Sequence, residues 1–179
     1  MEANTQQRKE QVRVLLKTRN MSALAEWAQN DRNIMRILMT YLYDRDETVY
    51  WRAIEGLATV ATQSAENDMD SVRRILQRLF WSMNDESGSV GWHAPEAIGE
   101  ILAKVPALIE EYGLILGSFM REEPFERGVH CALARIIPLK PEIFAGLKAD
   151  LVQSLNDPDQ SIRGYTLLAL KGMGDRYII

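Results

Sequence analysis

The sequence contains a single cysteine, Cys131, and therefore cannot form a disulfide within the chain. This absence excludes the small secreted modules that a disulfide framework holds together. No run approaches the roughly 18 apolar residues that a membrane-spanning helix needs. The polar N-terminal stretch also lacks the apolar segment of a signal peptide. We therefore expect a cytoplasmic protein with no membrane partner.

A strong charge of either sign is missing as well. The formal net charge is −4, whereas proteins that bind nucleic acid phosphates usually present a basic surface. The chain has two histidines and shows no His-Glu-x-x-His pattern, glycine-rich phosphate loop or nucleophile elbow. We therefore expect no metal and no cofactor, and the composition argues against a nucleic acid partner. The 46% of hydrophobic residues is ordinary for a globular protein with a sizeable core.

An internal repeat organises the chain. The stretch "TVYWRAIEGLATV" at 48–60 aligns with "SVGWHAPEAIGEI" at 89–101, an offset of 41 residues. The aligned pairs include Val49 with Val90, Trp51 with Trp92, Ala53 with Ala94, Glu55 with Glu96, and Leu57 with Ile98. Two further blocks, "FERGVHCALARII" and "IRGYTLLALKGM", share the apolar frame, with Phe125 and Ile162 as anchors. Helix-like segments separate these blocks, and no period-2 strand pattern is convincing.

The repeating unit is therefore a helix, a turn that is often acidic, and a second helix. The stretches "LNDPDQSIRGYTLLALKGMG" and "LYDRDETVYWRAIEGLATV" resemble HEAT-like repeats of the phycobilin-lyase type, and the resemblance covers roughly residues 31–174. Arg163 fits the family pattern, whereas Tyr50, Gly91 and Glu126 depart from it. The resemblance implies an all-α fold, a right-handed α-α superhelix of about five helix pairs. First helices would line the convex face and second helices the concave face.

We expect one HEAT-like repeat domain over 1–179. Residues 1–30 would form a degenerate N-terminal cap pair, and 31–64, 68–104, 106–138 and 141–174 would form repeat pairs, followed by a tail at 175–179. HEAT-like arrays are mostly binding scaffolds, although relatives include phycobilin lyases and alkylpurine DNA glycosylases. The chain matches no catalytic motif of either enzyme. No feature of the sequence defines an oligomeric state.

The second helices predict an outward-facing set of residues. A helix advances about 100° per residue, so the apolar positions share one face, and positions two and six after each anchor lie opposite it. Those positions hold Trp51 with Glu55 and Trp92 with Glu96. Grouped exposed aromatics indicate a recognition surface, and neighbouring carboxylates suit a basic side chain. The predicted binding residues are Trp51, Glu55, Trp92 and Glu96 at the centre of the concave groove, with Arg52, His93, Glu100 and Arg127 as its polar rim.

The leading hypothesis is a non-enzymatic binding scaffold whose concave groove holds a partner protein or peptide. The alternative is a HEAT-like enzyme or small-ligand binder, acting on a bilin-like chromophore or a damaged base. Glu96 would then be the acid–base residue, and Trp51 and Trp92 a stacking platform. A DNA-binding array is a third hypothesis, which the acidic Glu55 and Glu96 oppose. Both tryptophans could instead only fill the groove between helices.

Three local features remain open. Pro95 would disrupt a helix that began before it, so either the helix kinks at Gly91 or it begins near His93 with Pro95 in its first turn. Cys131 has basic neighbours that could favour a thiolate, although an inert cysteine is the simpler interpretation. The stretch "SVRRILQRLF" places Arg73, Arg74 and Arg78 on an outer helix face, a solvated surface or a phosphate site.

Overall fold

The computed structural model describes residues 2–31, 33–84 and 92–174. Within these residues the chain is all-helical, with short 3-10 segments between the α-helices and no strand. This confirms the predicted all-α class. None of the helices found in the described ranges combines the length and the apolar character needed to cross a membrane. The chain divides into two compact units, Met1–His93 and Ala94–Ile179.

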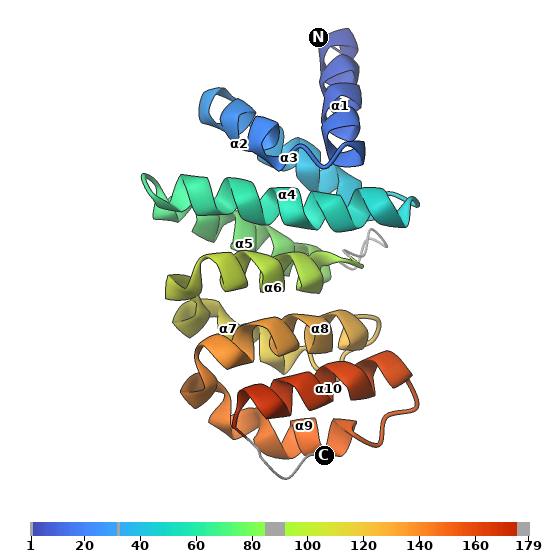
Figure 1. Ribbon diagram of the computed structural model, residues 1–179, viewed down its shortest axis with the longest axis vertical. Helices are drawn as coiled ribbons and strands as arrows, with labels where there is room; N and C mark the ends of the chain where they lie inside the picture. The colour runs from blue at the N-terminus through green and yellow to red at the C-terminus, as the bar shows by residue number, and fades with distance from the viewer. Residues whose placement is uncertain (1, 32, 85–91, 175–179) are drawn as a thin grey trace. The chain divides into compact units, whose positions relative to one another are not determined.

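The N-terminal unit is built around its longest helix. Its elements are α1 (Glu2–Lys17), α2 (Met21–Asn30), α3 (Asn33–Thr40), η1 (Tyr41–Tyr43), α4 (Glu47–Ala65) and α5 (Met69–Met83). Helix α4 contacts all four of the other α-helices, and Figure 1 shows α5 behind it. Apolar residues of every helix form the core, including Leu16, Leu24, Leu38, Leu57 and Leu76.

The C-terminal unit follows a more regular order. Its elements are α6 (Ala94–Lys104), η2 (Pro106–Leu108), α7 (Ile109–Ser118), α8 (Glu126–Ile136), η3 (Ile137–Leu139), η4 (Pro141–Leu147), α9 (Lys148–Ser154) and α10 (Gln160–Gly172). Helices α6, α8 and α10 lie side by side in chain order, as Figure 1 shows. Helix α7 packs on α6 and α8, and α9 packs on α10.

The acidic turns begin helices. The carboxylate of Asp46 accepts a hydrogen bond from the backbone N–H of Thr48 at the start of α4, and Asp159 does the same for Ser161 in α10. Asp68 caps α5 in the same way. A side-chain oxygen at this position satisfies a backbone donor that has no partner inside the helix. This explains why acidic residues precede the repeat blocks in the sequence.

The buried face of the second helices agrees with the predicted frame. The positions four, seven, eight and eleven residues after each anchor are buried in α4, α6 and α8. In α10 the first of them is Thr166, which is buried and donates its hydroxyl hydrogen to the carbonyl of Ile162 at 2.7 Å. A polar residue fits this face because its hydrogen bond is made within the helix.

The helices coincide closely with the predicted pairs. Helices α1 and α2 occupy the predicted cap pair, and each later pair of α-helices falls within one predicted repeat to within one residue. The division between the two units lies at His93, inside the predicted pair 68–104. The single domain and the right-handed superhelix stay predictions, and the predicted tail at 175–179 lies outside the described residues.

Candidate functional site

The N-terminal unit has an aromatic surface, which we define as Tyr50, Trp51 and His93 together with Trp92, the residue next to His93 in the chain. Tyr50 and Trp51 lie in the first part of α4, and their rings are 5.4 Å apart at a tilt of 40°. The imidazole of His93 stacks on the ring of Tyr50, with centroids 3.9 Å apart and planes 9° from parallel. The stacking of His93 therefore holds the segment that contains Trp92, just before α6, against the start of α4.

Three tryptophans of this unit, Trp51, Trp81 and Trp92, have exposed side chains, whereas Trp27 is half-buried. Trp51 is 38% exposed and Trp92 is 61% exposed, which confirms that both side chains point outward. Trp81, on α5, is 77% exposed. A tryptophan side chain in water keeps a large apolar area hydrated, and grouped exposed aromatics are typical of recognition surfaces.

The start of α6 corrects the expected geometry of Trp92 and His93. Helix α6 begins at Ala94 with Pro95 in its first turn, so the second of the two expected arrangements is the observed one. A proline is tolerated there because its missing N–H has no partner within the helix. The repeat alignment predicts that Trp92 and Glu96 lie on one face of a helix. In the structure Trp92 and His93 precede α6, so neither shares a helical face with Glu96. Gly91 lies outside the described residues.

Glu55 already has a cationic partner within the chain. Its carboxylate accepts two hydrogen bonds from Arg19, at 3.0 Å from Nε to Oε2 and 3.1 Å from Nη2 to Oε1. Such a two-point pair is the preferred geometry of a guanidinium with a carboxylate. The expected site for a partner's basic side chain at Glu55 is therefore engaged by Arg19.

Arg52, predicted at the rim of the binding groove, contacts the backbone at the end of α1. Its Nη1 donates to the backbone carbonyls of Leu16, at 3.1 Å, and of Lys17, at 2.5 Å. These two residues end α1, where carbonyl groups lack partners within the helix. Arg52 therefore joins α4 to the end of α1, and its predicted role in binding stays a prediction.

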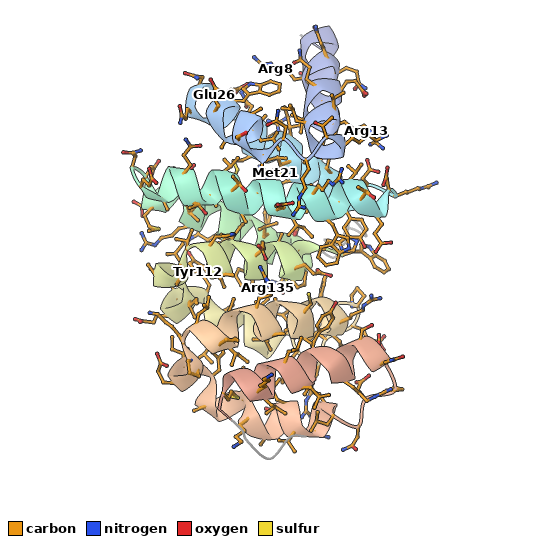
Figure 2. The ribbon with its side chains drawn as sticks, viewed as in Figure 1. Arg8, Arg13, Met21, Glu26, Tyr112 and Arg135 are labelled. Carbon is orange, nitrogen blue, oxygen red and sulfur yellow. The ribbon has the colours of Figure 1, made fainter. Side chains whose placement is uncertain are left out.

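The two predicted glutamates of α6, Glu96 and Glu100, lie against α8. A Cβ atom added to Gly128 would lie 2.6 Å from Oε2 of Glu96, so glycine leaves the room that this half-buried carboxylate occupies. Glu100 accepts hydrogen bonds from Arg135 at 3.0 and 2.7 Å. Figure 2 labels Arg135 where α8 faces α6. Arg127 is exposed at the start of α8.

His130 is buried and Cys131 is half-buried. Burial raises the pKa of the Cys131 thiol and outweighs the opposing effects of its hydrogen bond with Tyr165 and of the charge of Arg135, so the thiolate suggested by its basic neighbours is disfavoured. His130 is 3% exposed, and burial lowers its pKa while its Nδ1 donates to the carbonyl of Glu126 at 2.7 Å. In the described ranges, no group of three or more metal-ligating side chains is found.

The structure thus brings together only part of the predicted set. Trp51, Trp92 and His93 share one surface of the N-terminal unit, whereas Glu96, Glu100 and Arg127 belong to the C-terminal unit. The sequence analysis missed the contributions of Tyr50, Arg19, Arg135 and Gly128. Tyr50 gave a signal, because it departs from the family pattern, but Arg19 and Arg135 act through contacts 36 and 35 residues away along the chain.

The chain is 28% identical, over 140 residues, to an uncharacterized protein from Archaeoglobus fulgidus. The alignment covers 77% of this chain and 73% of that protein. No protein-family model matches the chain. No solved structure matches it.

Proposed function

We propose that the chain is a non-enzymatic binding module built from HEAT-like helix pairs, and that its aromatic surface binds a segment of a partner protein. The observation that carries this proposal is the exposure of Trp51 and Trp92 beside the Tyr50–His93 stack. Tryptophan and tyrosine are the residues that contribute most to protein–protein affinity when a partner buries them. Here the stack holds part of the surface rigid before binding, which lowers the entropy lost on association.

The partner's chemistry follows from what the surface offers. Aromatic faces attract apolar side chains and also lysine or arginine, through the negative charge of the ring face. Glu55 is already paired with Arg19, so the rings rather than this carboxylate would recognise the partner. We therefore expect a segment with apolar and basic side chains.

The HEAT-like arrangement rests on two observations. The pairing of helices agrees with the repeat, and the second helices α6, α8 and α10 lie side by side in chain order. Stacked helix pairs provide extended surfaces, which is how such repeats bind partners.

The proposal is tested by quantitative affinity capture from host lysate with three baits: wild type, Trp92→Ala and Trp81→Ala. Trp92 is exposed and precedes α6, so its truncation is expected to leave the fold intact, as melting curves will check. A partner that binds the aromatic surface is bound about thirtyfold less tightly by Trp92→Ala, since central tryptophans of interfaces contribute about 2 kcal/mol or more. Trp81→Ala removes an even more exposed tryptophan that is not one of the four residues of this surface and should capture as wild type does.

Equal capture by wild type and Trp92→Ala, with loss in Trp81→Ala, would contradict the proposal. Loss in both variants would point to non-specific attraction by exposed aromatics instead of a defined surface. The identity of the captured protein is then read by mass spectrometry.

A second candidate is a small-ligand binder that uses Glu96. It is supported by the half-buried carboxylate over Gly128 and by its electrostatic interaction with Cys131 and Tyr165. A metabolite screen with Glu96→Gln separates the two candidates. Loss of a bound metabolite in this variant would favour the second, whereas the first requires unchanged capture of the partner protein.

A further inference from the structure

The N-terminal unit contains a cleft of about 650 Å³, and none of the predicted binding residues lines it. It is formed by the end of α2, by α3, by the second half of α4 and by the start of α5 with the loop before it. Its volume falls within the range of small-molecule sites, about 300–1,000 Å³. The residues that line it from α5 are Ser71, Arg74, Ile75 and Arg78, spaced as one stripe of that helix.

The sequence suggested either a solvated face or a phosphate site for the stretch "SVRRILQRLF". In the structure its arginines lie on two different surfaces. Arg74 and Arg78 line the cleft, and Arg73, which pairs with Asp70, does not. Arg36 of α3 lines the cleft too. The cleft therefore receives arginines from two different helices.

Two of the three arginines that line the cleft, Arg36 and Arg78, can pair with an anionic ligand. Arg74 pairs with Asp68 at 3.2 Å. Arg36 and Arg78 make no ion pair with any residue that the structure describes. A guanidinium presents several N–H donors in one plane, and this geometry matches the oxygens of a phosphate or a carboxylate.

A second and independent observation comes from α4. Oε1 of Gln63 is buried and has no hydrogen-bond partner in the described part of the chain, although Gln63 lines the cleft. A buried acceptor without a donor costs about 1–3 kcal/mol, and most such atoms in native proteins are satisfied. A ligand with an N–H or O–H group would satisfy it.

The remaining lining is partly apolar and partly polar, and the polar part includes Gln29, Ser64, Asn67 and the acidic Glu66 and Asp68, of which Asp68 pairs with Arg74. Met35 and Val60 are buried, and Met39 and Ile75 are half-buried, so the cleft has an apolar side. Methionine side chains adapt to ligand shape and contact aromatic rings favourably.

We propose that this cleft binds a small organic anion about the size of a nucleoside monophosphate. Its phosphate or carboxylate group is held by Arg36 and Arg78, its amino or hydroxyl group donates to Oε1 of Gln63, and its apolar body lies against Met39 and Ile75. None of the residues of the aromatic surface lines this cleft, so the test of ligand binding is independent of the test of partner binding.

The test is calorimetric titration of the full chain with three probes: AMP, citrate and inorganic phosphate. AMP combines a phosphate, an amino donor and a flat ring, citrate offers carboxylates with a hydroxyl donor, and phosphate offers the anion alone. We expect AMP to bind more tightly than inorganic phosphate because its ring uses the apolar side and its amino group reaches Gln63, and citrate to do so because it adds further carboxylates and a hydroxyl donor. The better organic probe identifies phosphate or carboxylate as the preferred anion.

Matched variants locate the site. Arg36→Ala/Arg78→Ala is expected to weaken binding of the better probe by about tenfold or more, since it removes two charge-assisted contacts. Arg45→Ala removes an exposed arginine of the same unit outside the cleft and should bind as wild type does. Gln63→Leu should weaken the organic probe while leaving inorganic phosphate unchanged.

The proposal is overturned if neither AMP nor citrate binds. It is also overturned if inorganic phosphate binds as tightly as they do, or if Arg45→Ala weakens binding as much as the double variant. Melting curves confirm that each variant is folded, and all substituted side chains but Gln63 are exposed.

Discussion

The two units share one repeat frame and differ in what the frame leaves at the surface. In the N-terminal unit, the outward position two residues after the anchor is Trp51, part of an aromatic surface. In the C-terminal unit, outward positions hold Arg127 in α8 and Leu168, which is 56% exposed, in α10. Packing constrains the residues of the buried face in both units. The outward residues are not constrained in this way, and they differ between the units.

The units differ in packing too. Helices α6 and α8 approach so closely that a Cβ atom on Gly99 would lie 2.4 Å from Cβ of Ala132. In the N-terminal unit, a Cβ atom on Gly56 would meet Leu24 and Leu38 at 3.3 Å, where side-chain ends can give way. The C-terminal unit therefore depends more strictly on a small residue at its helix contact.

The largest effect is expected from Gly99→Ala. The added methyl group overlaps Ala132, including its backbone, so we expect a loss of about 2–3 kcal/mol in the free energy of unfolding. Urea unfolding followed by circular dichroism measures it. Gly164→Ala is the control, because nothing lies within 4 Å of the added atom in α10, and it should stabilise by about 0.5–1 kcal/mol. A neutral Gly99→Ala would mean that α6 and α8 can separate without cost.

Arg52→Met is expected to destabilise the N-terminal unit by about 1–2 kcal/mol, because the last carbonyls of α1 lose a charged donor. Hydrogen exchange should increase at the end of α1 and stay unchanged in α8. Arg127→Met removes an exposed arginine of the C-terminal unit and should change stability by less than about 0.5 kcal/mol. Similar losses of stability in the two variants would contradict the structural role assigned to Arg52.

A smaller effect is expected from pH, in the C-terminal unit. Burial lowers the pKa of His130, so the unfolded chain binds a proton at higher pH than the folded one. The stability is therefore complete above the ordinary histidine pKa of about 6.5 and falls as the pH drops from there towards the lowered folded value. Asp157 and Glu126 attract the protonated ring and limit the effect. His130→Phe should flatten this part of the pH–stability profile, and an unchanged profile would contradict the assignment.

The smallest effect concerns the two arginine–glutamate pairs. Double-mutant cycles on Glu100–Arg135 should give a coupling of about 0.5–1 kcal/mol, as for other partly exposed pairs. The Glu55–Arg19 pair is more exposed and should give less. A larger coupling for Glu55–Arg19 would reverse this order and indicate that Arg19 organises the surface next to α4.

The helices and the buried face were predictable because both follow from local periodicity. The repeat of apolar positions identified the second helices, and the acidic turns marked their starts, as Asp46 and Asp159 show. Proline chemistry limited the start of α6 to two arrangements, and the one with Pro95 in the first turn is observed.

The roles of charged residues were not predictable, because they depend on contacts far apart along the chain. Glu55 was expected to bind a partner, but it pairs with Arg19, which lies in the turn after α1. Arg52 was expected at a rim, but its donors meet the carbonyls of Leu16 and Lys17. Helical spacing gives the side of a helix on which a residue lies, and it does not show which distant residue lies opposite.

The central claim is that partner binding belongs to the aromatic surface of the N-terminal unit. The most direct test places a photo-crosslinking amino acid at position 51 in one protein and at position 168, on the exposed face of α10, in another. After irradiation in host lysate, the account predicts a defined partner adduct from position 51 and none from position 168. An adduct from position 168 alone would contradict it and move the binding surface to the C-terminal unit.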